Sequence, residues 1–160
     1  MTDTKAIMHA LLPAQSVLID VEAESKKDLL QSVAQVASGQ SGLDSHVIFD
    51  VLWEREKLGS TGVGYGIAIP HGRVPGVEKV VGLFARLKSP LAYESLDEKP
   101  VDLVFLLMAP ENAGADHLQA LSAVSRLLRN KALCQNLRTA KDAESIYRFL
   151  TETEPDEQAA

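Results

Sequence analysis

The run from Val101 to Ala109 constrains the fold of this chain most, because every residue in it except Asp102 is apolar. A short run without a polar side is typical of a central strand that is buried on both faces of a sheet. Such a strand needs covering layers on both sides. The sequence therefore predicts a layered α/β domain of the α+β type, with helices packed on a mixed sheet.

Capping residues, glycines and hydrophobic periodicity predict the other elements. Ser25 and Asp28 form a capping box that opens a helix. Asp44 and Asp116 are typical N-caps of two further long helices. The expected order is one strand, two helices, three strands and three helices. The strands are expected at residues 16–22, 67–69, 80–87 and 101–109, and the two short last helices at 132–137 and 143–150.

The chain has 160 residues and shows no internal repeat, linker or low-complexity block, which favours a single domain. We expect that domain to cover residues 16–150. Residues 1–15 show no clear periodicity and are predicted to be a loose N-terminal arm. Residues 151–160 are predicted to be a disordered tail, because they carry four acidic residues and no basic one.

The charge balance and the single cysteine exclude several classes of protein. There are 16 Lys and Arg against 22 Asp and Glu, a net charge of −6, which argues against binding of nucleic acid. No apolar run approaches the roughly 18 residues of a membrane span. The start of the chain lacks the pattern of a secretory signal. Cys134 is the only cysteine, which fits a reducing compartment, so we expect a cytoplasmic protein.

His71 is the most unusual position in the sequence. A short apolar strand is expected to end at Pro70, whose fixed φ directs the next residue outward. The small neighbours Gly66 and Gly72 leave the imidazole open to a large partner. The alternative interpretation is an ordinary histidine in a turn.

Two further residues combine a polar group with an apolar helix face. His117 lies at the expected start of a long helix and in line with its inner residues, where it is either functional or a half-buried histidine bonded to a carbonyl. Arg55 continues the inner stripe of its helix and needs an anionic partner. That partner is either a structural carboxylate or a bound phosphoryl group, which the guanidinium suits well.

The glycine-rich segment 59–66 does not fit a known nucleotide-binding pattern. Gly64 is followed by Tyr65 rather than by the lysine of a Walker A loop, and Ile67 stands where a dinucleotide pattern needs glycine. A flexible loop remains, whose N–H groups and the hydroxyls of Ser60 and Thr61 could hold an anion. The four histidines have no spacing typical of a metal site.

The stretch REKLGSTGVGYGIAIPHGR, residues 55–73, resembles the mannitol/fructose-type enzyme IIA domains of the bacterial phosphoenolpyruvate-dependent phosphotransferase system. The resemblance is strongest to the nitrogen-regulatory branch of that family. It extends from about residue 16 to 150 and includes KPVDLVF at 99–105 and DHLQALS at 116–122. Tyr65 departs from the family pattern, in which asparagine is often found.

The resemblance implies a three-layer α/β/α sandwich and a site for phosphoryl transfer without a cofactor or metal. His71 matches the histidine that is phosphorylated on its Nε2 (tele) nitrogen. His117 matches the second histidine of the site, which would donate a hydrogen bond, and Arg55 matches the arginine that stabilises charge. The segment that lines the site corresponds to Ser60, Thr61, Gly62 and Gly64.

The resemblance also implies partners. The donor would be a phosphohistidine carrier protein of the HPr type, and the targets would be regulatory proteins such as sensor kinases or potassium transport components. One alternative is a sugar-specific enzyme IIA that passes the phosphoryl group to an enzyme IIB. The other is a non-enzymatic regulatory module, in which the glycine loop, Arg55 and His117 bind an anion.

Overall fold

A computed structural model describes residues 3–154 of the chain. It contains a six-stranded mixed sheet with the strand order β1-β5-β6-β3-β2, and β4 also pairs with β6. The strands are β1 (Val17–Val21), β2 (Gly62–Gly64), β3 (Ile67–Ala68), β4 (His71–Arg73), β5 (Val81–Leu91) and β6 (Val101–Ala109). The helices are α1 (Thr4–Leu11), α2 (Lys26–Ser41), α3 (Ser45–Lys57), α4 (Ala115–Leu127), α5 (Lys131–Thr139) and α6 (Ala143–Glu152), and a 3₁₀ turn covers Ala14–Ser16.

Strand β6 is the centre of the sheet, as its composition predicts. It pairs antiparallel with β5 and parallel with both β3 and β4. Every residue of β6 except Asp102 is buried. Successive side chains point to opposite faces, so Phe105 and Leu107 belong to one hydrophobic cluster and Val104 and Leu106 to the other.

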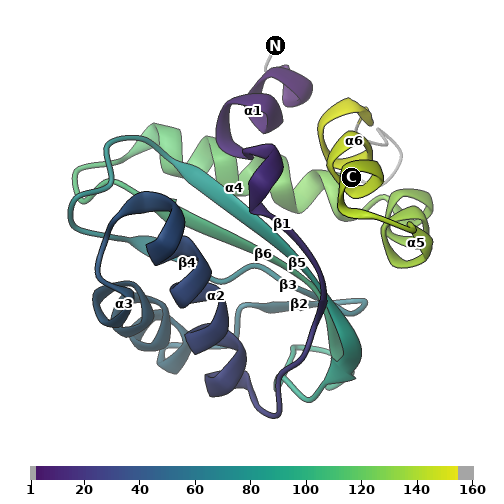
Figure 1. Ribbon diagram of the computed structural model, residues 1–160, viewed down its shortest axis with the longest axis horizontal. Coiled ribbons are helices and arrows are strands. Elements are labelled where there is room, and N and C mark those ends of the chain that lie inside the picture. The colour runs from purple at the N-terminus through teal and green to yellow at the C-terminus, as the bar shows by residue number, and fades with distance from the viewer. Residues whose placement is uncertain (1–2, 155–160) are drawn as a thin grey trace.

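Helices cover both faces of the sheet, which confirms the three-layer α/β/α sandwich. Helices α2 and α3 lie on one face, and α1, α4, α5 and α6 lie on the other (Figure 1). Within residues 3–154, no helix is long and apolar enough to cross a membrane.

The prediction of a loose arm over residues 1–15 is wrong for the part that the structure describes. Asp3 caps α1 by accepting a hydrogen bond from the backbone N–H of Ala6. Met8 and Leu12 are fully buried, and Leu11 is almost so, in the cluster beneath α4 and α6. The helix forms because its apolar residues, spaced three and four apart, meet the sheet and the C-terminal helix.

The predicted order of elements is wrong in two places. Helix α1 precedes the first strand, and five strands rather than three lie between α3 and α4. The additional strands, β2 and β4, arise because the glycine-rich segment pairs with β3 and its continuation pairs with β6. Helix α4 begins one residue before Asp116, which does not cap it, since Gly114 is the N-cap.

The prediction of a disordered tail over residues 151–160 is wrong at Thr151, Glu152 and Glu154. Thr151 and Glu152 belong to α6, and Thr151 is buried. Glu152 lies 3.0 Å from Nε2 of His9, and Glu154 lies 3.3 Å from Nζ of Lys5, so both acids contact the helix at the other end of the chain. The remainder of the predicted tail, 155–160, lies outside the described residues.

Candidate functional site

His71 is the first residue of β4, not a turn residue, and it pairs with Leu107 of the central strand. Its Nδ1 lies 2.8 Å from the carbonyl oxygen of Ile69. A carbonyl oxygen can only accept, so Nδ1 carries the proton in the neutral ring and Nε2 has a lone pair. The backbone thus selects the tautomer that presents Nε2 as a nucleophile.

His117 lies near the start of α4, next to His71. The two ring centroids are 5.7 Å apart, and the ring planes meet at 68°. The Nε2 atom of His117 is buried and has no hydrogen-bond partner among residues 3–154. An unsatisfied buried polar atom is costly by about 1–3 kcal/mol, so this nitrogen is suited to a group that arrives at the site. No carbonyl of residues 3–154 therefore holds this nitrogen.

Burial, more than any nearby charge, favours the neutral form of both histidines. Burial lowers the pKa of His71 from its ordinary value of 6.5, and the charge of Arg55 lowers it further. The hydrogen bond to the Ile69 carbonyl and the charge of Glu56 raise this pKa, but the net shift is downward. Burial also lowers the pKa of His117, followed by the charges of His71 and Arg73. Both rings are therefore neutral near pH 7, and a neutral imidazole is a nucleophile.

Arg55 lies in the last turn of α3, half-buried, and donates from one terminal nitrogen to the carbonyl oxygen of Gly59 at 2.9 Å. It has no carboxylate partner among residues 3–154, which leaves its charge available to an anion. The structure therefore brings three predicted residues together: His71 and His117 as neighbours, and Arg55 close enough for its charge to act on His71.

Two residues that influence this site were missed in the sequence. Arg73 is exposed on β4 two residues after His71, and its charge acts on His117. Residues i and i+2 of a strand share a face, so assigning His71 to a strand would have identified Arg73. Glu56, next to Arg55, is buried, and its carboxylate acts on His71.

Glu56 is the centre of a buried hydrogen-bond network. It accepts bonds from the N–H of Thr61 at 3.0 Å, the hydroxyl of Thr61 at 2.5 Å and the hydroxyl of Tyr93 at 3.2 Å. Nζ of Lys26 lies 3.0 Å away. Burial alone would raise the pKa of Glu56, but the bonds from Thr61 and Lys26 lower it. The hydroxyl of Thr61 is thus committed to a carboxylate.

The other predicted loop residues also lie in defined structure. The Ser60 hydroxyl accepts a bond from the N–H of Gly62 at 3.0 Å. Gly62 and Gly64 are the ends of β2, where a Cβ on Gly62 would lie 2.3 Å from Oγ of Ser95. The segment that was expected to be a flexible anion-binding loop is a short hairpin with its backbone paired to β3.

This arrangement suits a phosphoryl group on Nε2 of His71. Nε2 of His71 provides the attacking atom, and Nε2 of His117, which has no partner in the described part of the chain, provides a hydrogen bond. Two nearby arginines, Arg55 and Arg73, provide positive charge. Across the described part of the chain, no group of three or more His, Cys, Asp or Glu side chains is arranged to hold a metal ion.

Comparisons with known proteins agree with the geometry. Residues 10–153 match the family described as phosphoenolpyruvate-dependent sugar phosphotransferase system, EIIA 2. A nitrogen regulatory protein of Bradyrhizobium diazoefficiens is 51% identical over 140 residues, which cover 88% of this chain and 92% of that protein. The crystal structure of nitrogen regulatory protein IIA-Ntr from Neisseria meningitidis superposes with a TM-score of 0.85 at 39% identity, covering 91% of this chain and 99% of that one.

A more distant structure shares the fold. It is the complex of enzyme IIAMTL and phosphorylated enzyme IIBMTL from Escherichia coli, which matches with a TM-score of 0.73 at 18% identity and covers 89% of this chain and all of that one. The fold and the match over most of the length lead to the same family. The chain belongs to the EIIA type 2 family of the phosphoenolpyruvate-dependent sugar phosphotransferase system, whose members carry phosphoryl groups between proteins.

Proposed function

We propose that the protein accepts a phosphoryl group on Nε2 of His71 from a phosphohistidine on a carrier protein of the HPr type, in the cytoplasm. The observation that carries this proposal is the bond between Nδ1 of His71 and the Ile69 carbonyl, because it leaves Nε2 with the lone pair. In the transfer, a bond forms between Nε2 and phosphorus while the donor's N–P bond breaks. Each ring keeps the proton on its other nitrogen, so no proton has to move.

The neighbouring groups stabilise the transfer electrostatically. As the ring of His71 becomes positive, the Ile69 carbonyl accepts a stronger hydrogen bond from Nδ1. His117 donates from Nε2 to a phosphoryl oxygen, and Arg55 stabilises the charge on the other oxygens. Phosphoryl transfer depends mainly on such positioning and charge stabilisation. We assign no role in contacting the phosphoryl group to Thr61, Gly62 or Gly64.

The phosphorylated and unphosphorylated forms would bind different regulatory targets, such as sensor kinases or potassium transport components. A phosphoryl group adds about −1.5 to −2 charges near neutral pH by analogy with other phosphorylated side chains. Two exposed residues near this site could sense the added charge. Arg73 acts electrostatically on His117, and Leu118, which follows His117 in the chain, is 70% exposed. The name of the relative from Bradyrhizobium diazoefficiens, a nitrogen regulatory protein, supports a regulatory role.

The second candidate is a sugar-specific enzyme IIA that passes its phosphoryl group to an enzyme IIB. The family description names a sugar phosphotransferase system, and a protein of the same fold forms a complex with a phosphorylated enzyme IIB. Phosphoryl transfer to an enzyme IIB, with sugar phosphorylation, would favour this candidate. The non-enzymatic anion module has less support, because the glycine loop that it needs is a paired hairpin.

The test is the intact mass of the protein after incubation with phosphoenolpyruvate and the general phosphotransferase proteins. The wild type should gain one phosphoryl group that is labile in acid and stable in alkali, and His71→Ala should gain none. His46→Ala is the matched control, since His46 is an exposed histidine on α3 and should not affect the gain. Stoichiometric phosphorylation of His71→Ala would disprove the assignment. No gain on the wild type, with carriers of both the sugar and the nitrogen branch, would favour the anion module.

A further inference from the structure

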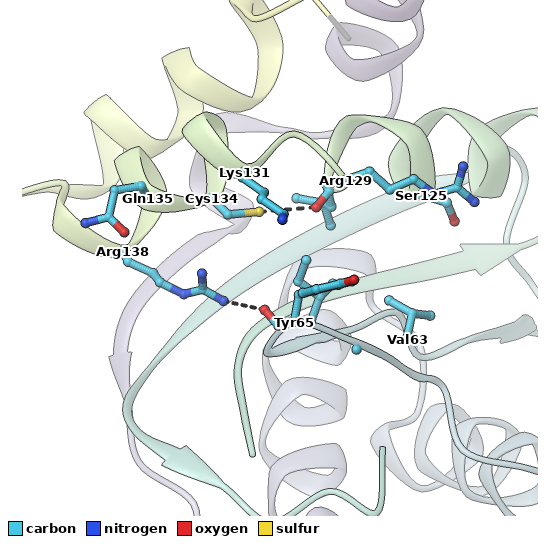
Figure 2. Close-up of a pocket in the computed structure, with 11 residues that line it drawn as sticks. Val63, Tyr65, Ser125, Arg129, Lys131, Cys134, Gln135 and Arg138 are labelled. Atoms are coloured by element: carbon cyan, nitrogen blue, oxygen red, sulfur yellow. Dashed lines mark hydrogen bonds between the residues drawn. The ribbon is translucent and has the colours of Figure 1, made fainter. Parts of the chain in front are cut away.

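A pocket of about 800 Å³ lies between the β2–β3 hairpin and the connection from α4 to α5 (Figure 2). Its volume is in the range of small-molecule sites, roughly 300–1,000 Å³. Val63, Tyr65 and Ile67 line it on the side of the hairpin, and Arg129, Lys131 and Arg138 line it on the side of the helices. It is separate from the site above, because neither His71 nor His117 lines it.

The pocket has an excess of positive charge in a protein whose net charge is −6. Arg138 is neutralised by Asp102, to which it donates two hydrogen bonds of 2.8 and 3.0 Å. Arg129 and Lys131 also line the pocket, and neither has a carboxylate partner within the described residues. Two uncompensated positive charges at the same pocket favour an anionic ligand.

Tyr65 presents an exposed aromatic ring to these charges from a backbone that is held in place. The residue is 71% exposed, yet both of its backbone polar groups are held: the N–H donates to Asp97 at 3.0 Å, and the carbonyl accepts from Arg138 at 2.7 Å. Nζ of Lys131 lies 5.5 Å from the ring centroid. Figure 2 shows the ring on one wall, with Lys131 and Arg129 on the other. An exposed ring on a fixed backbone is suited to stacking with a planar ligand.

We propose that this pocket binds a small organic phosphate that carries a planar ring, such as a nucleoside monophosphate. The phosphate carries close to two negative charges, which matches Arg129 and Lys131, whereas a carboxylate would neutralise only one of them. The ring of the ligand stacks on Tyr65, and the buried side chains of Ile67, Leu128 and Cys134 give the pocket an apolar part of its lining. The amide of Gln135 and the hydroxyl of Ser125 offer hydrogen bonds to the ring edge or the sugar.

Isothermal titration calorimetry of the full chain with adenosine 5′-monophosphate, adenosine and inorganic phosphate tests the proposal. The monophosphate should bind saturably, and each of the other two should bind about tenfold more weakly, because each keeps only one of the two recognised groups. Phosphate that binds as tightly as the monophosphate would overturn the role of Tyr65. Adenosine that binds equally well would overturn the role of the cations, and the absence of saturable binding by the monophosphate would overturn the whole proposal.

Variants of exposed residues separate the pocket from general electrostatic attraction. Arg129→Ala combined with Lys131→Ala should weaken binding of the monophosphate about tenfold or more. Lys57→Ala combined with Arg148→Ala removes the same charge from exposed positions elsewhere and should change binding by less than about twofold. Equal weakening by both pairs would overturn the assignment. Tyr65→Asn should also weaken binding, without added backbone strain, since asparagine tolerates the φ of 57° at this position.

Discussion

Thr61 donates both its backbone N–H and its side-chain hydroxyl to one carboxylate, that of Glu56. This pair joins the last turn of α3, which carries Arg55, to the residue before β2. Tyr93 and Lys26 bond to the same carboxylate and connect the chain after β5 and the start of α2 to it. Thr61, which was expected to line an anion site, therefore helps to hold α3 and the β2 segment together.

Substitution of Glu56 by Gln should destabilise the protein by roughly 2–4 kcal/mol at pH 7, because it leaves the ammonium group of Lys26, 13% exposed, without its buried partner. The pKa of Glu56 is lower in the folded protein than its ordinary 4.5, so its ionisation stabilises the fold above that value. The difference in free energy of unfolding between the variant and the wild type should shrink as the pH falls below 4.5. Urea unfolding at several pH values measures it, and a difference independent of pH would contradict the role of the charge.

Replacement of His117 by Ala should slow phosphorylation of His71 by about 100-fold without preventing it, as expected for loss of one hydrogen-bond donor to the transferred group. The final extent should still reach one phosphoryl group per chain. Rapid-quench sampling followed by intact-mass analysis gives the rate. His117→Gln, which keeps an N–H donor, should be less impaired than His117→Ala. Equal rates for wild type and His117→Ala would remove His117 from the site.

The titration of His71 should have its midpoint below pH 6.5, since burial and then Arg55 lower its pKa. Neutral His71 is the reactive form, so the rate of phosphorylation should be half-maximal at this midpoint, below pH 6.5, and should fall further at lower pH. Arg55→Ala should raise the midpoint, whereas Lys57→Ala, an exposed residue of the same helix, should not. NMR of the imidazole ring measures both, and a wild-type midpoint at or above 6.5 would exclude this electrostatic description.

Substitution of Gly72 by Ala should destabilise the protein by about 1–3 kcal/mol, because the new Cβ would lie 2.4 Å from Cγ1 of Val51 on α3. Val51→Ala in the same chain removes that atom and should recover part of the loss. Gly39→Ala is the matched control. Gly39 lies within α2, and a new Cβ there would meet no atom of the described residues within 4 Å outside the neighbouring helix backbone, so this variant should gain about 0.5–1 kcal/mol. Thermal unfolding compares the four proteins. If Gly72→Ala is as stable as the wild type, β4 does not pack against α3 as described.

The elements with strong local signals were predictable. The apolar residues of β6 identify a doubly buried strand without any knowledge of its partners, and the caps at Ser25 and Asp44 are observed. Strands β2 and β4 were not predictable, because short strands rich in glycine form only through pairing with distant segments. Helix α1 was not predictable for the same reason, since Met8 and Leu12 are buried only by contact with the sheet and α6, which lie far along the chain.

The candidate site was predictable where a residue was unusual in its own context. His71 after Pro70, His117 at a helix start and Arg55 on an apolar face all attract attention in the sequence. Glu56 did not, because an acid near the end of an amphipathic helix is ordinary until its burial is known. The bonds of Thr61 to Glu56 were not predictable either, because they depend on that burial.

The contacts of Glu152 with His9 and of Glu154 with Lys5 hold α1 and the end of α6 close together. A domain fused to either end would therefore meet α1 and α6 together, and tension between the two ends would act first on these exposed pairs and not on the sheet. The same proximity favours circular permutation: a short linker between the ends would let the chain be opened at a surface connection elsewhere, with the strand that carries His71 left intact.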